Sequence, residues 1–138
     1  MPLSTHLVYY ENAVGRLSEH ANGYAIVQYK PGKRLLGDFQ ALLTHLGNLL
    51  QRRSWHKVLT DQRAMTPFTE EERRWVQEQW LVAEPGRPSG IMVALLLPED
   101  VFARLATNLV MHDTQEGHLR YHIFQDEVSA AAWLRQAP

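Results

Sequence analysis

Three polar residues, Asp61, Gln62 and Arg63, follow directly on a short apolar stretch. A carboxylate beside a guanidinium has two uses: the pair fixes a turn, or the arginine fork binds a carboxylate or phosphate. The preceding residues 56–61 predict a buried strand, and in an open α/β sheet ligands and partners meet the fold where such strands end. The sequence therefore places a candidate binding site at these three residues, and leaves open whether Asp61 only fixes the turn.

A helix is predicted to follow this strand end, beginning at Thr69. Thr69 and Glu72 have capping-box spacing, and the acidic residues 70–72 complement the positive end of the helix dipole. The apolar residues of this helix are Trp75, Val76 and Trp80. Trp75 and Trp80 stand about a turn and a half apart, so one can pack in the core while the other lines a groove. Both are candidate residues for binding a partner or ligand.

Basic residues also flank the Pro31-Gly32 turn, where Lys30, Lys33 and Arg34 separate a predicted strand from a helix. Cations and free backbone N–H groups at a helix start can bind an anion. The segment lacks the Gly-Lys-Ser/Thr pattern of a phosphate-binding loop. A solvated turn is the favoured interpretation.

The remaining reactive residue types form no catalytic or metal-binding pattern. His118 and His122 share one face of a predicted strand, but Arg120 lies between them and opposes a metal cation. The chain has no cysteine, and no serine stands in a nucleophile-elbow motif. We therefore expect no catalytic residue, no metal and no cofactor.

Composition fits one small domain: 138 residues, 45% of them hydrophobic, with a net charge of −1. That charge argues against nucleic-acid binding, although eleven arginines stand against three lysines. The longest apolar run, Ile91 to Leu97, is too short to span a membrane. The N-terminus lacks the pattern of a signal peptide. A single-domain cytoplasmic protein is the expectation.

The N-terminal quarter predicts antiparallel strands. Residues 6–10, 14–20 and 24–30 alternate or read as extended, and Asn22-Gly23 is typical of a type I′ hairpin turn. On the third of these strands Ala25, Val27 and Tyr29 are expected to share one face, with Tyr24, Ile26 and Gln28 on the other.

Helices and strands alternate in the rest of the chain. A helix over 34–53 carries an apolar stripe made of Leu35, Phe39, Leu42, Leu46, Leu49 and Leu50. Strands are expected at 56–61, 91–97 and 119–124, a breaker-rich loop at 84–90 and a helix at 98–111. Asp126 caps a last helix that carries Val128, Ala131 and Leu134. This order predicts an α/β fold: a mixed sheet, antiparallel at its N-terminal side and parallel afterwards.

The element order over nearly the whole chain resembles the STAS superfamily, in its SpoIIAA-like, anti-sigma-factor-antagonist branch. The local resemblance is strongest in VLTDQRAMTPFTEEERRW and FQDEVSAAAWL. It implies a non-catalytic module that binds a partner kinase and is switched by phosphorylation of a serine after a strand. This chain has no serine or glycine-rich turn there, and Thr66 is the nearest hydroxyl by position.

The functional expectation is a non-enzymatic binding or regulatory module that acts through protein–protein contact. Thr66 is the candidate phosphorylation site, although the charge of the acidic residues 70–72 opposes a phosphate there. The alternative is a binder of a small apolar or anionic ligand near the second helix, with Arg63 as its anion contact. Spare leucine and aromatic surface also suggests a homodimer.

Overall fold

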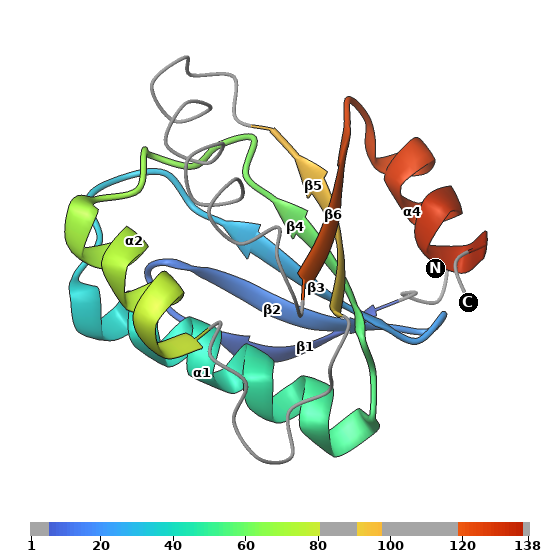
Figure 1. Ribbon diagram of the computed structural model, residues 1–138, viewed down its shortest axis with the longest axis horizontal. Helices are drawn as coiled ribbons and strands as arrows, with labels where there is room; N and C mark the ends of the chain where they lie inside the picture. Colours follow the sequence, from blue (N-terminus) through green and yellow to red (C-terminus); the bar gives the residue numbers. More distant parts are fainter. Residues whose placement is uncertain (1–5, 81–90, 98–118, 137–138) are drawn as a thin grey trace.

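A computed structural model describes residues 6–80, 91–97 and 119–136 (Figure 1). Six strands form one sheet in the order β1-β2-β3-β4-β5-β6. β1, β2 and β3 pair antiparallel, and β3 to β6 pair parallel. The strands are β1 (His6–Glu11), β2 (Gly15–His20), β3 (Tyr24–Tyr29), β4 (Lys57–Asp61), β5 (Ile91–Leu96) and β6 (Leu119–Phe124). The predicted mixed α/β sheet is confirmed.

Two layers of helices cover the sheet (Figure 1). The helices are α1 (Leu36–Arg53), α2 (Glu70–Trp75), its π-helical continuation η1 (Val76–Trp80) and α4 (Glu127–Gln136). Because the parallel strands follow one another in sequence order, right-handed crossovers place their connecting helices on one face. α1 and α2 lie on that face, and α4, which follows the last strand, lies on the other.

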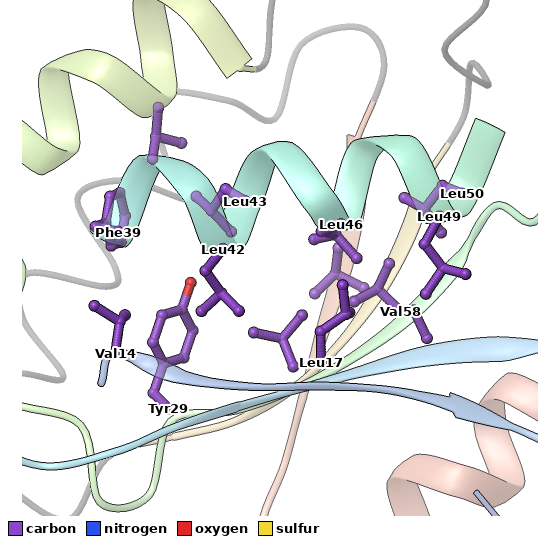
Figure 2. Packing of buried hydrophobic residues seen from close by; sticks show 14 of the residues in the cluster. Val14, Leu17, Tyr29, Phe39, Leu42, Leu43, Leu46, Leu49, Leu50 and Val58 are labelled. Atoms are coloured by element: carbon purple, nitrogen blue, oxygen red, sulfur yellow. The ribbon is translucent and has the colours of Figure 1, made fainter. Parts of the chain in front are cut away.

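The larger core lies between the sheet and α1. The α1 side chains at three- and four-residue spacing pack on the inward side chains of β2, β3 and β4 (Figure 2). Ala25, Val27 and Tyr29 of β3 share this face, as the alternation predicts. The buried residues of α1 are Phe39, Leu42, Leu43, Leu46, Gly47, Leu49 and Leu50.

A second, smaller core lies under α4. Tyr24, Leu59 and Leu96 face it from the sheet, and Ala130 and Leu134 face it from the helix. The predicted cap is present, because Asp126 Oδ1 accepts the Ser129 N–H at 2.7 Å. No helix in the described part of the chain has both the length and the apolar character to cross a membrane.

Two apolar side chains assigned to helix faces are exposed instead. Leu35, expected in the α1 stripe, is the residue before the helix and is 71% exposed. Val128, expected on α4, is 78% exposed, whereas Ala130 is buried. The two cases differ: Leu35 precedes the first residue of α1, so the helical spacing was carried one residue too far, whereas Val128 lies within α4 but on its outer side.

The β2–β3 hairpin also differs from its prediction. His20 pairs with Tyr24, so the loop has three residues, and only Gly23 has a positive φ, 88°. The Gly23 N–H bonds the carbonyl of His20 at 3.0 Å. This is a turn closed by one left-handed glycine, and the type I′ turn with two positive φ angles was wrong. The predicted loop at 84–90 and helix at 98–111 lie outside the described residues.

Gly15 is expected to tolerate no side chain, because an added Cβ would stand 2.7 Å from the carbonyl oxygen of Gln28. Gly15→Ala should lower the free energy of unfolding by about 1–3 kcal/mol, measured by urea denaturation. Gly37→Ala is the matched control, since a Cβ there meets nothing within 4 Å and alanine favours the helix. Equal stabilities of the two variants would contradict the close approach of Gly15 in β2 to the Gln28 carbonyl in β3.

Candidate functional site

The strands β3, β4, β5 and β6 all end on one edge of the sheet, called the carboxyl edge below. On its α4 face, the register places Glu11, Arg16, Gln28 and Asp61 in one row across four strands. Arg16 and Lys30 form ion pairs with Glu11 at 3.2 and 2.9 Å. The edge is therefore lined by polar side chains that bind one another.

Asp61 ends β4 and is held by Arg63. The Arg63 backbone N–H and Nε donate to Asp61 Oδ1 at 3.1 and 3.0 Å, and Nη2 donates to Oδ2 at 2.9 Å. Burial alone would raise the pKa of Asp61, but the bonds and charge of Arg63, with a bond from Gln28, outweigh it and lower the pKa. Asp61 thus stays ionised. It accepts a hydrogen bond from the Arg63 backbone, which fixes the turn, and it forms an ion pair with the Arg63 guanidinium.

Gln62 continues this turn from inside the protein. Its N–H donates to the carbonyl of Leu96 at 3.0 Å, and its own carbonyl accepts the Met65 N–H at 3.1 Å. Gln62 is only 1% exposed. The outer surface of this loop is formed by Arg63, Ala64 and Thr66, which are exposed.

A buried ion pair between Arg34 and Glu72 lies at the far end of the same loop. Arg34 Nε donates to Glu72 Oε2 at 2.7 Å, and Nη2 donates to Oε1 at 2.6 Å. The two side chains are 3% and 2% exposed. Glu72 Oε1 also accepts the Thr69 N–H at 2.8 Å, and Thr69 Oγ1 accepts the Glu72 N–H, so the predicted capping box is present. One carboxylate therefore caps α2 and anchors the β3–α1 loop.

The remaining donors of Arg34 reach the backbone of the β4–α2 loop. Nη1 donates to the carbonyl of Thr66 and Nη2 to that of Pro67, both at 2.8 Å. In return, the Gly32 N–H donates to Thr66 Oγ1 at 2.9 Å, where Gly32 has a φ of 107°. The β3–α1 and β4–α2 loops are thus tied together by three hydrogen bonds, and two more join Arg34 to Glu72 in α2.

Arg34 corrects the solvated-turn interpretation of the Pro31-Gly32 segment. Lys33 is exposed and Lys30 half-exposed, as expected, but Arg34 is buried. The partners are 38 residues apart in the chain, so no local spacing reveals them. The one signal in the sequence was the residue type. An arginine just before an apolar helix can form a bidentate bond with a carboxylate, which a lysine cannot.

Trp75 belongs to an aromatic cluster beneath this loop. Its ring meets Phe39 edge-on at 6.1 Å, and Phe68 meets Phe39 edge-on at 6.0 Å. Tyr29 completes the cluster and reaches from the sheet toward α1 (Figure 2). Burial raises the pKa of Tyr29, so its hydroxyl stays protonated. The side chain of Trp80 lies outside what the structure describes.

The structure therefore joins only part of the predicted site. Asp61 and Arg63 form one contact set, and Thr66 joins Arg34 in another. Trp75 is half-buried against α1. A shallow hollow of about 90 Å³ opens beside α2, lined by Phe68, Thr69, Glu70 and Arg73. Its volume is well below the roughly 300–1,000 Å³ of small-molecule pockets.

Histidines in the described ranges form no metal-binding group with acidic residues. His122 stacks on Trp133 at 5.6 Å and contacts Phe124 at 4.9 Å. His118 lies outside those ranges.

Comparisons with protein-family models, curated proteins and solved structures found no match.

Breaking the buried ion pair should cost far more stability than breaking an exposed one on the same helix. Glu72→Gln leaves the Arg34 charge buried without its partner, and we expect a loss of about 3–5 kcal/mol. Glu70→Gln removes the exposed pair with Arg74, 3.4 Å long, and should cost about 0.5 kcal/mol or less. Urea unfolding measures both, and similar losses would contradict the anchoring role of Glu72.

Proposed function

We propose that this chain is a non-enzymatic binding or regulatory module whose partner-binding surface is the β4–α2 loop. The observation that carries the proposal is that the charged groups behind this loop are used to hold it. Asp61 binds Arg63, and Glu72 binds Arg34. The loop is thereby presented as a preformed surface, which lowers the entropy lost on binding a partner.

The exposed part of the loop has a mixed chemical character. The Arg63 side chain is 44% exposed even while it binds Asp61, and Ala64 and Thr66 are exposed beside it. A partly exposed guanidinium next to small side chains suits a protein surface that offers a carboxylate. The resemblance of residues 58–75 to the SpoIIAA-like branch of the STAS superfamily supports the same location. The hollow beside α2 is too small to support a second proposal for an organic ligand.

The surface can be blocked without disturbing the contacts behind it. Ala64→Glu places a charged, larger side chain on the loop, and Ala21→Glu makes the same change in the exposed β2–β3 turn at the other end of the sheet. Affinity capture from the host lysate, with quantitative mass spectrometry, should recover a protein partner with the wild type and Ala21→Glu. We expect Ala64→Glu to lose most of it.

Circular dichroism should show the same fold for all three proteins. A partner retained by Ala64→Glu would contradict the location of the surface. If the wild type enriches no protein above a tag-only control, the binding role itself is contradicted.

Within this proposal, Thr66 is the hydroxyl that regulates the surface. Its Oγ1 holds the Gly32 N–H, and a phosphate there would add nearly two negative charges just ahead of the acidic residues 70–72. We expect that charge to displace Gly32 and loosen the loop. Protein purified from its own host should carry one phosphate that survives denaturation in mass spectrometry and is absent from Thr66→Val. A mass equal to that of the unmodified chain would contradict regulation through Thr66 but would not contradict the partner-binding surface.

A further inference from the structure

β1 forms one edge of the sheet, and its outer side has no neighbouring strand in the described ranges. Proteins usually protect such an edge with lysine, proline or a covering element, because its free N–H and C=O groups pair readily. β1 has the sequence HLVYYE, with neither lysine nor proline. Its acidic residue, Glu11, forms ion pairs with Arg16 and Lys30. The lysine and proline that normally discourage strand pairing are therefore missing from β1 itself.

Two neighbouring apolar residues of β1 are exposed on opposite faces of the sheet. Leu7 is 68% exposed and Val8 55% exposed. Leu7 shares the α1 face with Ala25, and Val8 shares the α4 face with Ile26. The other large apolar side chains exposed in the described residues are Leu35, Ile123 and Val128, which lie apart from one another in the sequence. Only at β1 do two of them adjoin along a free edge.

A bulge limits how much of this edge is regular. The register shifts between Val8 and Tyr10, and both Tyr9 and Tyr10 pack against the α1 core. Tyr10 also stacks on His45 of α1 at 3.9 Å. The bulge thus fixes the second half of β1 against the protein and leaves Leu7 and Val8 as the regular part of the edge, which pairs with no strand in the described ranges.

We propose that β1 pairs antiparallel with β1 of a second copy, about a two-fold axis close to Val8. Such an interface must be self-complementary. With the axis at Val8, the two copies of Val8 face each other, so apolar side chains meet at the centre of the contact, and the pairing ends at the bulge on each side. Glu11 lies beyond the paired residues, so the two carboxylates do not meet. This contact is independent of the surface on the β4–α2 loop.

The contact buries few residues, so the dimer is weak, with a Kd in the micromolar range. Opposed residues on antiparallel strands have Cβ atoms about 4.5–5.5 Å apart, close to the span of a disulfide. The chain has no cysteine, so any disulfide formed by a single-cysteine variant must join the introduced residue to its copy in a second molecule. Val8→Cys should form a covalent dimer under mild oxidation. Val128→Cys, on an even more exposed residue of α4, should remain monomeric at the same concentration.

Sedimentation of the unmodified protein gives the second measurement. We expect dimer formation at micromolar concentration, and Val8→Lys should raise the dimer Kd at least about tenfold because two like charges would face each other. Val128→Lys should leave the Kd unchanged. A monomeric wild type, a dimer insensitive to Val8→Lys, or equal cross-linking of the two cysteine variants would each overturn the proposal.

Discussion

The ion pair between Arg34 and Glu72 is the interaction on which the carboxyl edge of this protein depends. A buried ion pair adds little stability compared with two well-packed apolar side chains, but loss of either partner leaves an unpaired charge in the interior. Here that cost links three elements, because Glu72 caps α2 while Arg34 holds the carbonyls of Thr66 and Pro67. The start of α2 and both loops are therefore fixed in one arrangement. The aromatic rings of Phe39, Phe68 and Trp75 pack nearby.

This arrangement gives the β4–α2 connection an ordered path at both of its ends. At its start, Asp61 binds Arg63, and Gln62 continues the backbone pairing with Leu96. At its end, the capping box and the ion pair take over. The charged groups behind the loop serve as structural partners of one another. What the loop offers outward is a fixed surface, which is why binding is the function we propose.

Local sequence patterns predicted the parts of this fold that depend on neighbours in the chain. Alternation in β3, the capping box at Thr69 and the Asp126 cap involve residues a few positions apart, and the structure confirms each. The errors arose where a pattern ran past the start of a helix, as at Leu35, or assigned a residue to the wrong face of one, as at Val128. Arg34 was misjudged because its partner lies 38 residues away, and only the fold brings them together.

The central claim is that the Arg34–Glu72 pair holds the β4–α2 loop, and amide hydrogen exchange tests it directly. The amides of Gln62 and Met65 report on the loop, and that of Val27 reports on the sheet. In Arg34→Met, we predict that the loop amides lose at least about tenfold more protection than Val27. Equal loss at all three amides, or unchanged protection of Gln62 and Met65, would contradict the claim.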